Sequence, residues 1–251
     1  MMKVDLNADC GESFGRWTLG DDAAILREVT SANIACGAHA GDPEVMRATV
    51  HLCVGLGVAI GAHPGYPDLQ GFGRRALPMT AGEVFNSVLA QIGALHAIAR
   101  AEGAALAHVK AHGALYNHAA AHPPTARAIA DAVATFDRGL IFVALAGSGL
   151  AEAGRAAGLR VAEEAFADRA YEASGALRDR KLPGAMLETD AAAAAQSVAI
   201  VGAGGLTAHD GSRVGLHADT ICLHGDAPGA AARARAVRAA LAAAGITIAR
   251  L

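Results

Sequence analysis

The chain has 251 residues, of which 53% are hydrophobic and 18% charged, so it can bury a large core at the size typical of one (β/α) barrel. Its 21 basic and 24 acidic residues give a formal net charge of -3. No run of lysines or arginines is present that could bind the phosphate backbone of a nucleic acid. The N-terminus is polar where a signal peptide needs an apolar core, and no apolar stretch reaches the length of a membrane span. The four cysteines are widely separated, as expected for free thiols in a reducing compartment. We therefore expect a soluble cytoplasmic protein that binds neither nucleic acid nor membrane.

Short β-rich runs alternate with longer helical patterns, which is typical of parallel strands joined by crossover helices. The predicted strands lie near residues 3–8, 32–36, 58–62, 106–111, 140–145, 159–164 and 220–224. No linker or internal repeat interrupts this order. The pattern predicts an α/β fold in one domain, residues 1–251, built as a (β/α) barrel.

Helix starts are marked by capping residues. Asp42 precedes a proline, and Thr80 forms a capping box with Glu83 ahead of a helical pattern that continues to residue 102. We predict later caps at Thr125, Ser148 and Thr189, and a final helix over residues 229–244. The glycine-rich segment 202–216 allows no assignment.

Polar residues gather at the C-terminal ends of the first four predicted strands. Side chains two residues apart in a strand share a face, and the C-terminal ends of parallel barrel strands meet at one mouth. The residues concerned are Asn7, Asp9, Glu12, Asn33, His39, His63, His108, Lys110 and His112. Their coincidence at one mouth indicates a functional site.

Each of these residues also has a structural interpretation. A single histidine at a strand end is more often a hydrogen-bonded structural residue than a catalyst. Asp9 and Glu12 are equally suited to capping the turn after the first strand. Lys110 favours function more strongly, because lysine is rarely buried unpaired and this one lies in an apolar strand with a histidine on either side of it on the same face. A lysine that snorkels to the surface is the alternative.

Two loops add cations near the same mouth. Residues 71–75 form a glycine-rich loop whose arginines, Arg74 and Arg75, either clamp an anionic substrate or are simply solvated. Arg169 and Tyr171 follow the sixth predicted strand. From the residues alone, a loop ion pair and a packing aromatic are the simpler interpretation of these two.

Five ordered blocks of sequence together resemble the LamB/YcsF family, and they extend over most of the chain. The blocks are Val4–Gly15, Ser31–Gly37 with His39–Pro43, Gly61–Asp68 with Gly71–Arg75, Val109–Asn117 and Glu164–Tyr171. One departure is Ala38, where the family commonly has a larger aromatic residue. That change alters the shape of a pocket and leaves the polar residues in place.

The resemblance implies an irregular, TIM-like barrel related to the glycoside hydrolase/deacetylase barrels. It also implies an ATP-dependent cyclic amide hydrolase that works with two further 5-oxoprolinase subunits, B and C. The expected reaction converts 5-oxoproline, ATP and water into L-glutamate, ADP and phosphate, with Mg²⁺ carried by ATP as co-substrate.

With that activity, we predict two sets of site residues. The catalytic set is Asp9, His63, Lys110 and His112, and the substrate-binding set is Asn7, Glu12, His39, Arg75, Tyr116, Asn117, Arg169 and Tyr171. Lys110, with Arg75 or Arg169, would neutralise a phosphorylated amide oxygen or the substrate carboxylate, while Asp9 or a histidine deprotonates water. Asp9, His39 and His63 form an alternative set of ligands for a divalent metal ion.

Several alternatives remain open from the sequence. The chain has no G-x-x-x-x-G-K-[S/T] motif, so ATP binds here in another way or belongs to the partner subunits. The half-reaction carried by this chain is equally open. A stand-alone metal-dependent deacetylase or amidohydrolase, and a non-catalytic substrate-binding protein within the complex, are the competing functions.

Overall fold

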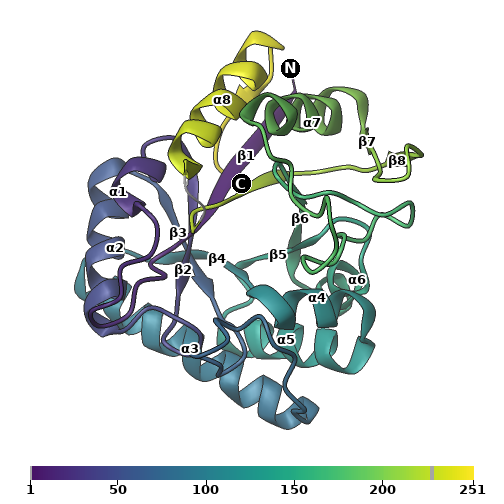
Figure 1. The fold of residues 1–251 in the computed structure, drawn as a ribbon. Helices are drawn as coiled ribbons and strands as arrows, with labels where there is room; N and C mark the ends of the chain where they lie inside the picture. Colours follow the sequence, from purple (N-terminus) through teal and green to yellow (C-terminus); the bar gives the residue numbers. More distant parts are fainter. Residues whose placement is uncertain (1, 227–228) are drawn as a thin grey trace.

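Seven parallel strands close into a barrel in the computed structural model, which describes residues 2–226 and 229–251 (Figure 1). The strands are β1 (Lys3–Cys10), β2 (Ser31–Ala35), β3 (Ala59–His63), β4 (Leu106–Lys110), β5 (Ile141–Leu145), β6 (Arg160–Phe166) and β9 (Thr220–His224). Each pairs in parallel with the next in this order, and β9 also pairs with β1 to close the ring. The short strand β10 (Thr247–Ile248) joins β1 beside Lys3 and Val4. The predicted irregular TIM-like barrel is confirmed, with seven strands where a regular TIM barrel has eight.

Helices surround the strands on the outside of the barrel (Figure 1). They are α1 (Asp22–Ile25), α2 (Pro43–Leu56), α3 (Ala81–Ala101), α4 (Gly113–Ala121), α5 (Pro123–Phe136), α6 (Gly149–Ala156), α7 (Asp190–Ala203) and α8 (Ala230–Ala243). Within the described ranges, none of these helices is both long enough and apolar enough to cross a membrane.

Most of the predicted caps are confirmed. The carboxylate of Asp42 accepts from the backbone at the start of α2, and the capping box of Thr80 and Glu83 opens α3. The hydroxyls of Ser148 and Thr189 cap α6 and α7 in the same way.

The cap predicted at Thr125 is wrong. The cap is three residues earlier, at His122, which precedes a pair of prolines, and the imidazole of His122 accepts from the backbone N–H of Thr125. Proline is favoured in the first turn because it has no N–H to leave unpaired. The glycine-rich segment left without assignment contains an antiparallel hairpin, β7 (Gly205–Thr207) and β8 (Arg213–Gly215).

The two faces of β1 explain why the inside of this barrel is polar. Its outward residues, from Val4 to Cys10 in alternation, pack in the apolar core. Its inward residues meet polar partners from other strands: Asp5 accepts from Ser31 and Thr220, and Asn7 donates to Glu164. Because buried polar groups need such partners, the alternation fixes the register of the strands. The inward polar residues of β1 continue to the mouth of the barrel.

Candidate functional site

A cavity of about 910 Å³ opens at the mouth formed by the C-terminal ends of the strands. Eight of the predicted site residues line it: Asp9, Glu12, His63, Lys110, His112, Tyr116, Asn117 and Arg169. Further polar side chains on its wall are Arg74, Arg180, His224 and Asp226. Residues from β1, β3, β4, β6 and β9 therefore meet in one place, as their positions at strand ends predicted.

Four predicted substrate-binding residues do not line the cavity. Asn7 lies beneath its floor, where its amide donates to Glu164 and Thr220. His39 lies behind the ring of His112. Tyr171 is fully buried, and its hydroxyl accepts from the backbone N–H of Phe166.

Arg75 is the fourth of them and the clearest difference from the predicted substrate contacts. Its side chain is 62% exposed and pairs with Asp68, so the carboxylate holds it outside the cavity. Its neighbour Arg74 lines the cavity instead and pairs with Asp226 at 2.5 Å. Periodicity does not determine the direction of two adjacent loop side chains, so the sequence did not distinguish them.

Lys110 is buried among acceptors at the floor of the cavity. Its ammonium lies 2.9 Å from Asp9 Oδ1, 2.8 Å from Glu164 Oε1 and 3.0 Å from Cys222 Sγ. An ammonium has three protons, and these three partners use them all. Lys110 therefore holds the two carboxylates in place and leaves no free donor for a substrate oxygen.

The same cluster determines which charges persist at neutral pH. Burial alone would raise the pKa of Asp9, but His63 and Lys110 hold it well below its ordinary value. Burial alone would lower the pKa of Lys110, but Asp9, Cys222 and Glu164 raise it well above its usual range. Asp9 is thus an ionised carboxylate at the cavity floor, oriented by a permanent cation.

Glu164 is the partner that the sequence interpretation missed. Its second oxygen accepts from the hydroxyl of Tyr116 at 2.7 Å, so it joins Lys110 to another predicted residue. A signal was present, since Glu164 stands in a strand that buries its C-terminal half. An acidic residue in an apolar strand indicates a buried ion pair, just as a lysine in such a strand does.

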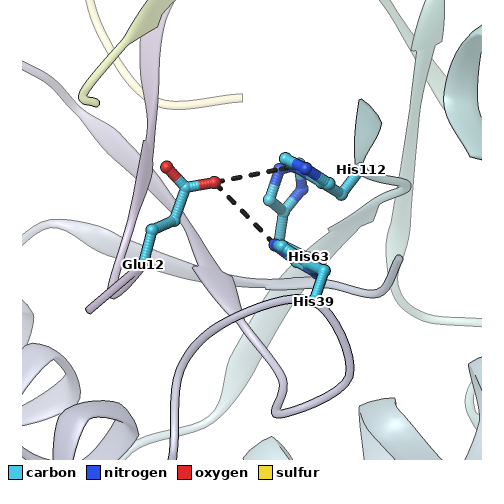
Figure 2. Close-up of side chains that lie close together, drawn as sticks. All are labelled: Glu12, His39, His63 and His112. Atoms are coloured by element: carbon cyan, nitrogen blue, oxygen red, sulfur yellow. Dashed lines mark hydrogen bonds and ion pairs between the residues drawn. The ribbon is translucent and has the colours of Figure 1, made fainter. Parts of the chain in front are cut away.

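Four side chains gather beside this cluster: Glu12, His39, His63 and His112 (Figure 2). One ligand atom from each lies within 4.8 Å of the others, and all four residues are buried. Burial lowers the pKa of His39 and His112, so both rings are neutral. Neutral imidazoles and a carboxylate are suitable metal ligands.

His224 lines the cavity and forms a pair with the buried Asp168. Asp168 accepts from His224 Nδ1 at 2.8 Å, and Arg180 donates to His224 Nε2 at 2.6 Å. Because arginine only donates, Nε2 carries the lone pair and Nδ1 the proton. The imidazole is thus held between the Asp168 carboxylate and the Arg180 guanidinium, and Nε2 becomes available as a base for proton transfer when Arg180 moves away from it.

Arg169 is a buried cation without a counter-ion. It is 3% exposed, and among the described residues no carboxylate lies within 4.0 Å of its guanidinium. Its hydrogen bonds go to the backbone carbonyls of Ala185 and Arg178. Burial, followed by the charge of Arg180, lowers its pKa to about 10, so it stays charged. A buried unpaired arginine on a cavity wall is suited to an anionic ligand.

His108 lies deeper in the barrel, where its Nε2 donates to Asn33 Oδ1 at 2.8 Å. Gly61 on the neighbouring strand makes room for it, since a Cβ there would collide with the imidazole. Burial, with help from the charge of Lys110, lowers the pKa of His108 from 6.5 to about 3.

This shift predicts acid sensitivity. Below pH 6.5 the unfolded chain binds a proton at His108 that the folded chain does not, so stability is lost as pH falls from 6.5 towards 3. The contribution is about 1.4 kcal/mol per pH unit. Urea unfolding of wild type and His108→Gln between about pH 6 and 4 should show a shallower loss for the variant by roughly that slope. Parallel profiles would contradict the assignment.

The chain is an α/β-barrel protein with a candidate active site. Its parallel strands form the barrel, and paired titratable side chains line the cavity at the C-terminal mouth. The LamB/YcsF family model matches residues 4–251, and the chain belongs to this family.

Named relatives cover nearly the whole chain. It is 61% identical to the 5-oxoprolinase A subunit of Chloroflexus aggregans, over 99% of this chain and 98% of that protein. It is 56% identical to the protein of the same name from Methylococcus capsulatus, over 99% and 95%.

Two solved structures are also similar. The lactam utilization protein of Thermus thermophilus has a TM-score of 0.94 and 50% identity, with both chains covered completely. A putative cellobiose-phosphate cleavage protein of Enterococcus faecalis has a TM-score of 0.59 at 14% identity, over 99% and 97% of the two chains. That second likeness is one of fold alone.

Proposed function

We propose that this chain is the A component of an ATP-dependent 5-oxoprolinase, which opens the lactam of 5-oxoproline to L-glutamate and converts ATP into ADP and phosphate. Relatives named as the A subunit of 5-oxoprolinase, at 52–61% identity over nearly the full chain, support this function. The name of those relatives also supports assembly with further subunits, here B and C. The structure of a lactam utilization protein at 50% identity points to the same class of substrate.

The observation that carries the proposal is the buried Arg169 on the cavity wall, which has no carboxylate partner within the part of the chain that the structure describes. 5-Oxoproline has one carboxylate and one amide in a small ring. A guanidinium binds a carboxylate through two parallel hydrogen bonds, and burial strengthens that interaction because water does not compete. With the carboxylate against Arg169, the ring lies in the cavity between the Asp9–Lys110 cluster and His224.

The chemistry proceeds through activation by ATP. Transfer of the γ-phosphoryl group to the amide oxygen releases ADP and makes the ring carbon a better electrophile. Water then attacks that carbon, the C–N bond breaks, and the nitrogen takes a proton. A second water hydrolyses the resulting acyl phosphate to glutamate and phosphate.

Several of the charged and titratable groups have a place in this scheme. Once Arg180 turns from His224 Nε2 to a phosphoryl oxygen, His224, held by Asp168, takes the proton from the attacking water and returns it to the departing nitrogen. Asp9 orients the water, and Lys110 keeps Asp9 ionised. Arg74 and Arg180, at the edge of the cavity, neutralise phosphoryl oxygens.

A reconstitution tests the proposal. The purified chain is mixed with candidate B and C subunits, 5-oxoproline and Mg-ATP, and glutamate and phosphate are measured together. We expect equal amounts of both, and none when any protein or ATP is left out. Glutamate formed by this chain with a metal ion alone would favour a stand-alone amidohydrolase, which the Glu12–histidine group would suit. Full turnover by B and C without this chain would contradict the proposal.

A further inference from the structure

Three buried atoms in the group of Glu12, His39, His63 and His112 lack the partners that buried polar atoms need. Glu12 Oε1 and both ring nitrogens of His39 have no hydrogen bond within the part of the chain that the structure describes. Glu12 is 6% exposed and His39 is 1% exposed, so bulk water does not replace those partners. Buried unsatisfied groups are rare because each costs about 1–3 kcal/mol.

The other two histidines each use one ring nitrogen as a donor. His63 Nδ1 lies 2.8 Å from the backbone carbonyl of Lys110, and His112 Nε2 lies 2.9 Å from that of Phe72. A carbonyl only accepts, so these two nitrogens carry the ring protons. With those nitrogens protonated, His63 Nε2 and His112 Nδ1 are the two that can present lone pairs.

Those two nitrogens face each other at 3.0 Å. Two acceptors at this distance repel unless a cation lies near both, and that cation is either a metal ion or a proton on His63 Nε2, which lies 3.3 Å from Asp9 Oδ2. Glu12 Oε1 adds a further acceptor, 3.6 Å from His112 Nδ1 and 3.8 Å from His39 Nε2 (Figure 2). A shared proton would leave Glu12 Oε1 and both nitrogens of His39 without partners, whereas a metal ion would take Glu12 Oε1 and, after a turn of its ring, one nitrogen of His39 as ligands.

We propose that this group binds one divalent transition-metal ion of the Zn²⁺ class, through His63 Nε2, His112 Nδ1, Glu12 Oε1 and His39. Ligands of tetrahedral zinc, at about 2.0–2.1 Å from the ion, lie about 3.3 Å from one another. The ligand atoms here lie within 4.8 Å of one another, with the two facing nitrogens of His63 and His112 at 3.0 Å, so a bound ion would draw the more distant ones inward. The backbone carbonyls that hold the far nitrogens of His63 and His112 supply the outer contacts that orient metal-binding imidazoles. Nitrogen-rich ligand sets of this kind favour zinc over magnesium.

His39 completes the site after a turn of its ring. It stacks on His112 with centroids 3.8 Å apart and an interplanar angle of 4°, so both rings cannot direct lone pairs at one ion as they stand. No hydrogen bond to a described residue holds His39 in this orientation. The three other ligands form the core of the site, and His39 is the fourth.

Glu12, and not the predicted Asp9, is the carboxylate ligand. Asp9 Oδ1 already accepts from Lys110 and Asn33, each at 2.9 Å. Glu12 Oε1 has no such partner among the residues that the structure describes. The proposed ligands are therefore Glu12, His39, His63 and His112 in place of the predicted Asp9, His39 and His63. Asp9 remains paired with Lys110.

A bound ion would act as a Lewis acid at the cavity wall, which Glu12, His63 and His112 help to line. His63 and His112 would then hold the ion as ligands and would not transfer protons. Metal binding does not depend on the proposed function, since it is measured without substrate or partner subunits.

Calorimetric titration of the chelator-treated full chain with Zn²⁺ tests the site. We expect one equivalent bound with Kd at or below about 1 µM, and a higher thermal unfolding midpoint in its presence. Glu12→Gln, His63→Gln and His112→Gln should each weaken binding by about 10–100-fold. Mg²⁺ should neither bind at this affinity nor compete.

The control is His51→Gln, because His51 is a surface histidine with a carboxylate neighbour. It should bind Zn²⁺ as wild type does, and circular dichroism verifies the fold of every variant. X-ray absorption at the zinc edge should report at least two imidazoles and one oxygen ligand. Absence of tight Zn²⁺ binding by wild type, as a proton shared by His63 and His112 would produce, would overturn the proposal. Equal binding by the three site variants, or loss of binding in His51→Gln, would do the same.

Discussion

A complex rebuilt with the Lys110→Met variant should convert 5-oxoproline at least about 10³-fold more slowly than the wild-type complex. Methionine keeps the length of the side chain and removes the ammonium, which leaves Asp9 and Glu164 facing each other in the barrel without a cation. One or both carboxylates must then take up a proton, and Asp9 loses its fixed orientation. Removal of one partner from a buried ion pair also costs about 3–5 kcal/mol of stability.

Two further variants separate the catalytic loss from poor folding. Lys3→Met changes an exposed lysine at the opposite end of β1 and should leave both turnover and urea unfolding unchanged. Lys110→Met combined with Glu164→Gln leaves one unpaired carboxylate in place of two, so it should recover part of the stability but not the turnover. Near wild-type turnover by a folded Lys110→Met complex would show that the cluster serves the fold alone.

The Arg169→Gln variant should lower kcat/KM for 5-oxoproline by about 10²-fold, chiefly through a higher KM, because a charge-assisted buried contact is worth about 1.5–3 kcal/mol. The sharper measurement is discrimination against 2-pyrrolidone, the same ring without the carboxylate. Wild type should strongly prefer 5-oxoproline, and Arg169→Gln should lose most of that preference. The loss in the variant should be confined to the substrate that carries the anion.

Arg160→Gln is the matched control, since Arg160 is exposed at the start of β6, away from the mouth of the barrel. It should keep both kcat/KM and the preference for 5-oxoproline. If Arg169→Gln kept the same preference as this control, the substrate carboxylate would have to bind elsewhere.

The fold was predictable because its signals are local. Strand alternation in β1 separates Asp5, Asn7 and Asp9 from the apolar face, and the caps of α2 and α3 are set by side chains within three residues. The start of α5 was missed because an imidazole is an uncommon cap. The β7–β8 hairpin was missed because its strands have three residues each, too few for an alternating pattern.

The site was predictable as a place and less so as a set of contacts. Parallel strands bring their C-terminal ends together, so the convergence of Asp9, His63 and Lys110 followed from strand order. Pairing between distant strands has no local signal, and the Asp168–His224 pair, which spans 56 residues, was therefore missed. The isolation of Arg169 from any described carboxylate likewise depends on where loops come to lie.

A crystal structure of the assembled complex with 5-oxoproline and a non-hydrolysable ATP analogue addresses most directly whether the lactam binds at the mouth of this barrel. We expect the carboxylate within about 3.2 Å of the Arg169 guanidinium and the ring carbon facing His224. A ring bound wholly on a partner protein, with Arg169 still bonded only to backbone carbonyls, would contradict the account.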